Sequence, residues 1–243
     1  MVEQSETVEG EQVDPDRFAA KLTGITREGV KIGLQLNDLL IAVNGVPFAY
    51  AKDELQQKLT YLTRRKTALT FRRDNRDFTV VASVPNVGNW DPVAAPIDVE
   101  KKRISATFLT NWEVFRSDDG LFDMQPLAPS LLALVAAPIW LAQMRLWVPF
   151  AMILSIVLIT LPFGQLMSMA VYGLASVYVW RMSQEMFRTD RIAKGLEPHL
   201  IFAAASERVA HRVYARLYPD DVFLYAPGAA GKLEDTIEKM GVE

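Results

Sequence analysis

The chain of 243 residues contains no cysteine. Disulfides, zinc sites built from thiolates and cysteine nucleophiles are therefore excluded. Histidine is nearly absent as well, since only His199 and His211 occur. Neither belongs to a His-Glu-x-x-His motif, which excludes a zinc protease of that type. Both lie outside the long apolar run described below, so histidine ligation of a cofactor within that run is not expected.

Other catalytic and nucleotide-binding motifs are missing too. No Gly-x-Ser-x-Gly nucleophile turn occurs, and Ser206 and His211 lie five residues apart on one predicted helix, a poor spacing for a catalytic pair. The Gly228–Lys232 segment lacks the spacing of a phosphate-binding loop. Clustered bases of the N-terminal part are offset by neighbouring acids, which argues against nucleic-acid binding: Arg72, Arg73 and Arg76 beside Asp74 and Asp77. We therefore expect no enzymatic activity, no cofactor, no metal and no nucleic-acid partner.

Charge is scarcest between Leu127 and Trp180, where 54 residues contain one charged side chain, Arg145. A bilayer span needs roughly 20 apolar residues, so this run predicts a membrane segment at residues 127–181. Breakers divide it into three blocks: Leu127–Met144, Leu146–Leu161 and Leu166–Trp180.

Two arrangements of these blocks are open. Three spans would put the two flanks on opposite sides of the membrane. We favour a hairpin of two spans that turns at Pro162–Gln165, preceded by an interfacial or re-entrant Leu127–Met144, because it keeps both flanks on the cytoplasmic side. The residues then expected at the membrane interface are Trp140, Arg145, Trp147, Trp180 and Arg181.

The N-terminal part, residues 18–85, has the pattern of a compact α/β module. Phe18–Ile25 and Leu39–Val43 are predicted strands, and Asn44-Gly45 is a strong turn signal. Asp53–Arg65 is a predicted helix with Leu55, Leu59 and Leu62 on one face. Two further predicted strands, 68–72 and 78–84, are joined by a polar turn.

The stretch from Gly33 to Gly45, GLQLNDLLIAVNG, resembles the signature of PDZ domains: Gly-Leu, two residues, Gly-Asp, an apolar strand and Asn-Gly. Asn37 stands where the family usually has glycine, and asparagine is the next-best residue for a left-handed backbone. The resemblance implies a groove in which a peptide C-terminus adds as a strand beside a helix.

Two readings of this groove are open. It binds peptides, or it is incomplete or filled by another strand of the chain, with Ile104–Leu109 as the candidate, and the fold serves only for docking. No Gly-Leu-Gly-Phe-like loop is visible for the carboxylate. A working groove would be walled by residues that are otherwise simply core: Phe18, Leu22, Ile25, Leu55, Leu59 and Leu62.

The flanking segments are polar. Residues 1–16 carry six acids and no base, so 1–17 are predicted to be a disordered tail. Residues 86–126 are predicted to be a linker with one strand and an aromatic segment, and residues 182–243 a basic helical tail. A helix is expected at Ile201–Leu217, where Arg208, Arg212 and Arg216 form a stripe suited to anionic lipid, to an acidic partner, or simply to solvent.

Together these features predict an α+β PDZ-like domain, an α-helical membrane hairpin and a C-terminal amphipathic helix. The membrane segment is weakly similar to a family of small bacterial inner-membrane proteins of unknown function. The start, Met1-Val2-Glu3, is unlike a signal peptide, so both termini are expected in the cytoplasm and the chain in a bacterial inner membrane. The function expected is an integral membrane adaptor, structural subunit or assembly factor that binds lipids, other membrane subunits and peptide C-termini. The alternative is an accessory subunit of a membrane enzyme or transporter.

Overall fold

The computed structural model describes residues 13–62, 65–83 and 86–227. The chain divides into two compact units, which are described one at a time. Unit 1 consists of Met1–Asn111 and Ile201–Leu217, and unit 2 of Trp112–Leu200 and Tyr218–Glu243. Most of the predicted acidic tail lies outside the described residues.

Unit 1 is built on a six-stranded antiparallel sheet with the order β5-β4-β2-β1-β6, in which the short β3 pairs with β2. The strands agree with the short apolar runs and turn residues between them. Their bounds are β1 (Val13–Ile25), β2 (Leu39–Val43), β3 (Val46–Pro47), β4 (Thr67–Arg73), β5 (Arg76–Ala82) and β6 (Gly88–Pro96).

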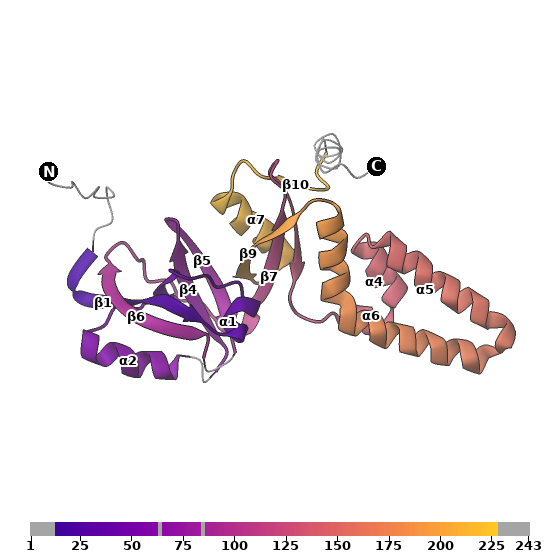
Figure 1. The fold of residues 1–243 in the computed structure, drawn as a ribbon, viewed down its shortest axis with the longest axis horizontal. Helices are drawn as coiled ribbons and strands as arrows, with labels where there is room; N and C mark the ends of the chain where they lie inside the picture. Colours follow the sequence, from indigo (N-terminus) through magenta and orange to yellow (C-terminus); the bar gives the residue numbers. More distant parts are fainter. Residues whose placement is uncertain (1–12, 63–64, 84–85, 228–243) are drawn as a thin grey trace. The chain divides into compact units, whose positions relative to one another are not determined.

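Two helices from the N-terminal part accompany this sheet, α1 (Arg27–Lys31) and α2 (Lys52–Tyr61). Helix α2 lies alongside β1 and β6 (Figure 1) and buries Leu55 and Leu59. The predicted helix is thus confirmed, although it ends earlier than expected, and strands predicted at 18–25, 39–43, 68–72 and 78–84 correspond to β1, β2, β4 and β5.

Turn chemistry in unit 1 also follows the sequence. Asn37 has a φ of 73°, the left-handed conformation expected where the PDZ signature has glycine. Asn44 and Gly45 have φ values of 50° and 76°, as an Asn-Gly hairpin turn requires. These are backbone angles that asparagine and glycine adopt at the lowest cost.

Two expectations for the later part of unit 1 are wrong. Ile104–Leu109 is not a strand, because it forms a loop and a single 3-10 turn, η1 (Ala106–Phe108). The helix expected from Ile201 begins later, as α7 (Glu207–Leu217), because the preceding residues belong to strand β9 (Glu197–Ala204).

The second sheet has four strands in the order β10-β8-β7-β9. It is mixed, since β10 (Val222–Phe223) pairs in parallel with β8 (Leu121–Pro126), and β8 pairs antiparallel with β7 (Thr110–Arg116). The expected linker at 86–126 therefore contains β6, β7 and β8.

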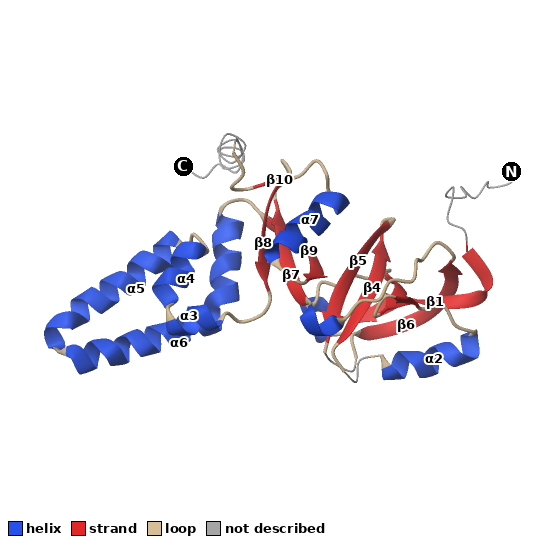
Figure 2. Ribbon diagram, turned by 180° about the vertical axis from the view of Figure 1, so that it is seen from behind, coloured by secondary structure: helices blue, strands red, loops and turns tan. Residues whose placement is uncertain are grey.

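The helices of unit 2 lie in the chain between β8 and β9 of this sheet (Figure 2). Apolar side chains from several of them form one core, which includes Leu141, Leu146, Ile153 and Val179. Their bounds are α3 (Leu131–Val135), α4 (Ala137–Gln143), α5 (Trp147–Thr160), the 3-10 turn η2 (Leu161–Phe163) and α6 (Gln165–Ala193).

The predicted pair of membrane spans is wrong. In the described part of the chain, no helix combines the length and the apolar character needed to cross a bilayer. Helix α5 has only 14 residues, about 21 Å at 1.5 Å per residue, against a hydrocarbon core of about 30 Å. Helix α6 is longer, but its second half is charged. The predictions of an integral membrane adaptor or subunit and of an inner-membrane location both depended on these spans. They are therefore wrong as well.

The charged half of α6 is used for packing within unit 2. Arg188 forms an ion pair of 2.8 Å with Glu113 on β7, and Arg191 one of 2.5 Å with Asp123 on β8. The hydrogen bond from Arg188 to Glu113 is the main reason that the pKa of Arg188 is raised. These ion pairs explain why the apolar pattern ends at Arg181 while the helix continues.

Candidate functional site

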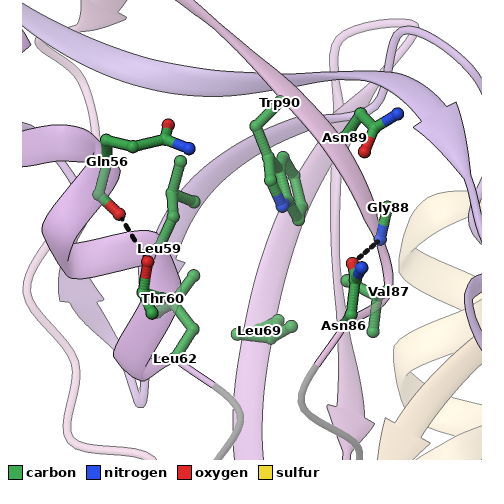
Figure 3. A pocket seen from close by; sticks show the side chains of 10 residues that line it. All are labelled: Gln56, Leu59, Thr60, Leu62, Leu69, Asn86, Val87, Gly88, Asn89 and Trp90. Carbon is green, nitrogen blue, oxygen red and sulfur yellow. Dashed lines mark hydrogen bonds between the residues drawn. The ribbon is translucent and has the colours of Figure 1, made fainter.

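A groove lies between α2 and β6 in unit 1, with a volume of about 580 Å³. Figure 3 shows side chains of α2 on one wall, with β6 and the residues before it on the other. The lining residues are Gln56, Leu59, Thr60, Leu62, Leu69, Asn86, Val87, Gly88, Asn89 and Trp90.

Apolar side chains form the inner part of the groove. Leu69 on β4 is fully buried, and Leu59 and Val87 are 8% and 2% exposed. The indole of Trp90 is directed into the space between the two walls (Figure 3) and stacks on Phe71, with ring centroids 6.1 Å apart. This gives an apolar surface large enough to receive a side chain.

Polar side chains surround this surface. Gln56 and Thr60 stand exposed on α2, and Asn86 and Asn89 are exposed on the opposite wall. Thr60 Oγ1 donates to the Gln56 carbonyl, and Asn86 Oδ1 accepts from the backbone N–H of Gly88 at 3.0 Å. Among the described residues, none that lines the groove is charged, so these side chains offer apolar contact and neutral hydrogen-bonding groups.

The backbone at the start of β6, which forms the wall opposite α2, lies in close contact with β1 and α1. Gly88 pairs with Ile25 of β1, and a Cβ at Gly88 would lie 2.2 Å from the carbonyl oxygen of Gly24. A Cβ at Gly29 would lie equally close, 2.2 Å, to the carbonyl oxygen of Val87. Glycine is therefore needed at both positions for the start of β6 to lie against the end of β1 and the start of α1.

The predicted groove residues are distributed over three places. Leu59 and Leu62 line the groove, whereas Leu55 is buried and does not. On β1, Leu22 is fully buried, and Phe18 and Ile25 are half-buried beside their partners on β6. Strand β1 thus pairs with β2 on one side and with β6 on the other, and none of its described residues lines the groove.

The position proposed for a strand of the chain itself is taken by β6 rather than by Ile104–Leu109. That later segment runs elsewhere in unit 1, where Lys102 N–H donates to the Gly45 carbonyl and Ile104 N–H to the Asn44 carbonyl, at 2.7 and 3.2 Å. It therefore packs on the Asn-Gly turn.

Sequence reasoning missed the β6 wall because Pro92 and Pro96 made the segment resemble a linker. Proline is confined to edge strands, bulges and strand ends, and β6 ends the strand order of its sheet. The available signal for this strand was a large aromatic residue, Trp90, between two stretches rich in turn-forming residues.

The remaining predicted residues occupy two other surfaces. Arg208, Arg212 and Arg216 are exposed along α7, opposite the buried Ala210 and Tyr214. In unit 2, Trp140 is buried, Trp180 is half-buried, and the other three are exposed where α5 and the apolar part of α6 meet the rest of the unit: Arg145, Trp147 and Arg181.

No family model, no curated protein and no solved structure matches this chain.

Proposed function

We propose that unit 1 is a peptide-binding module that holds an extended peptide C-terminus in the groove between α2 and β6. The observation that carries the proposal is the groove itself, an apolar hollow between a helix and the last strand of a sheet. The resemblance of Gly33–Gly45 to the PDZ signature supports the same function, because that family binds peptide ends beside a helix and a strand.

Strand addition suits the wall formed by β6. A strand at the end of a sheet presents backbone N–H and C=O groups that a peptide can pair with. Affinity would come from these backbone hydrogen bonds, and specificity from the side chains that enter the hollow. Leu59, Leu69 and Val87 favour an apolar side chain there.

The peptide end would lie near Asn86, Val87 and Gly88, where the chain turns into β6. Backbone N–H groups in such turns bind carboxylates in other proteins. Since the described lining offers no cation, a carboxylate would depend on neutral donors, which are the backbone N–H groups of this turn and the side-chain amides of Asn86 and Asn89. Binding is therefore expected to be of moderate affinity and to weaken when the carboxylate is amidated.

The experiment uses the full chain and a display library of random peptides with free C-termini. A selected peptide is titrated in calorimetry with its free and its amidated end. Thr60→Arg places a long side chain over the groove, and Gln57→Arg places the same charge on an exposed position of α2 that does not line it.

We expect Thr60→Arg and amidation each to weaken binding about tenfold or more, which corresponds to about 1.4 kcal/mol, and Gln57→Arg to change it little. A library that yields no binder, or a binder unaffected by Thr60→Arg, would leave the fold as a docking module without a peptide groove.

A further inference from the structure

We infer that the hairpin of α5, η2 and the apolar part of α6 inserts into one leaflet of an anionic lipid surface without crossing it. The inference concerns unit 2 and does not depend on the peptide groove of unit 1. It rests on the exposure, charge, length and internal hydrogen bonding of residues 146–180, called the apolar hairpin below.

The apolar hairpin exposes large hydrophobic side chains all around its two arms. Soluble proteins rarely expose contiguous apolar patches above a few hundred Å². At the turn and on α6, several large apolar side chains are more than half exposed: Phe163 at 74%, Leu166 at 86%, Met169 at 66% and Leu174 at 73%. On α5 the exposed ones include Val148 at 71%, Met152 at 60% and Ile159 at 67%.

The distribution of these side chains selects lipid over a protein partner. A helix that docks on a protein carries an apolar stripe on one side, whereas one that is apolar all round is surrounded by protein core or by lipid. On α5 only Ile153 is buried, and its exposed apolar residues face the other directions. Acyl chains can cover such a surface from every side.

Charge complementarity identifies the kind of lipid surface. No charged residue occurs between Arg145 and Arg181, and both arginines are exposed at the base of the two arms. Trp147 is exposed at the same base. Tryptophan and basic side chains are favoured at the headgroup level, and cations there attract anionic headgroups.

Length limits the insertion to one leaflet. Helix α5 has 14 residues, about 21 Å, which equals about half of the 40–45 Å of a bilayer with its headgroups. The turn at the tip is made by η2 and by Gly164, whose φ of 103° suits glycine.

Two hydroxyl groups of the apolar hairpin, those of Thr160 and Ser168, are bonded within their own helical segment. Thr160 Oγ1 donates to the Val157 carbonyl at 2.8 Å, and Ser168 Oγ to the Gly164 carbonyl at 3.3 Å. Hydroxyls bonded to their own helix do not need water, which is the condition for polar groups in lipid.

The test labels single cysteines, which is direct because the chain has none of its own. Phe163→Cys places an environment-sensitive fluorophore at the tip, and Thr189→Cys places it on an exposed position in the charged half of α6. Each full-length variant is mixed with phosphatidylcholine vesicles with and without phosphatidylglycerol, and with vesicles of brominated lipid that quench at the acyl chains.

We expect the label at position 163 to shift to the blue and to be quenched several-fold by brominated lipid, most with phosphatidylglycerol, while the label at 189 stays in water. A water-soluble reductant sealed inside the vesicles should not reduce the fluorophore attached at position 163. Paired replacement of Leu166 and Leu174 by Gln should reduce vesicle binding, whereas Phe108→Gln, another exposed apolar side chain, should not.

Three results would overturn the inference. A label at 163 that remains in water with all vesicles would show that lipid does not cover the apolar hairpin. A blue shift without vesicles that grows with protein concentration would assign the surface to a second copy of the chain. Reduction from inside the vesicle would show that the tip crosses the bilayer.

Discussion

Asp123 and Arg191 form a buried ion pair, with Arg191 Nε 2.5 Å from Asp123 Oδ2. The side chains are 7% and 2% exposed and lie 68 residues apart in the sequence. Arg191 also bonds Asp190 and the Met144 carbonyl. This contact joins the charged half of α6 to β8 within unit 2.

Removing one partner of this pair should destabilise unit 2. Arg191→Met leaves the Asp123 carboxylate buried without its main cation, and a loss of about 3–5 kcal/mol in the free energy of unfolding is expected. Adding Asp123→Leu should restore most of the loss, because no uncompensated charge then remains. Denaturant unfolding of the single and double variants measures both, and a double variant no better than the single one would contradict the explanation.

The pH dependence of the same pair has a definite sign. Burial raises the pKa of the Asp123 carboxyl above its usual 3.8, and Arg191 opposes that rise. A carboxyl with a raised folded pKa binds more protons in the folded state, so its contribution to stability falls as pH rises from the unfolded pKa to the folded one. Wild type should therefore lose stability relative to Asp123→Asn over that interval. If the stability of wild type relative to Asp123→Asn instead increased with pH, the attraction of Arg191 would outweigh burial in setting the pKa of Asp123.

Gly88→Ala should disturb both the fold of unit 1 and its groove. The new Cβ would meet the Gly24 carbonyl and the Leu22 side chain at 2.2 and 2.5 Å, and overpacking of this kind costs about 1–3 kcal/mol. Faster hydrogen exchange in β1 and β6 should accompany weaker peptide binding. Gly173→Ala is the control, since nothing lies within 4 Å of its Cβ, and it should not destabilise the chain.

Arg73→Lys should not be a neutral substitution. Arg73 Nε and Nη2 both lie 2.6 Å from the Asp38 carboxylate, and Nη2 also donates to the Gly33 carbonyl. A lysine ammonium cannot reproduce this planar pair of bonds, while Asp38 remains fully buried. We expect a loss of about 1–3 kcal/mol in thermal or denaturant unfolding. Arg76→Lys, on an exposed neighbouring position, should change stability by less than about 0.5 kcal/mol.

Exposed positions of the apolar hairpin and buried positions in the rest of unit 2 should differ in their effect on stability. Leu166→Ala removes a side chain that is 86% exposed, so stability in detergent should change little. Leu141→Ala empties a fully buried position of the same unit and should cost about 2–5 kcal/mol. Equal losses from both would show that another surface covers Leu166 in the folded protein.

The sequence alone predicted those features of the fold that depend on residues close to one another in the chain. The Asn44-Gly45 turn, the spacing of Leu55 and Leu59, and the strands around the polar turn at Asp74 were all predicted, because turn angles and helix or strand faces depend on residues a few positions apart. The scarcity of charge between Arg145 and Arg181 likewise identified the apolar hairpin as a distinct segment.

The tertiary structure decided what each of these elements packs against. The proline-containing segment that became β6 covers β1 and forms a wall of the groove, and the expected peptide walls at Leu22 and Ile25 are therefore occupied. Helix α6 continues past the apolar run because Glu113 and Asp123, far away in the sequence, accept its arginines. Strand pairing and buried ion pairs depend on partners that the fold brings together, so local pattern and propensity do not determine them.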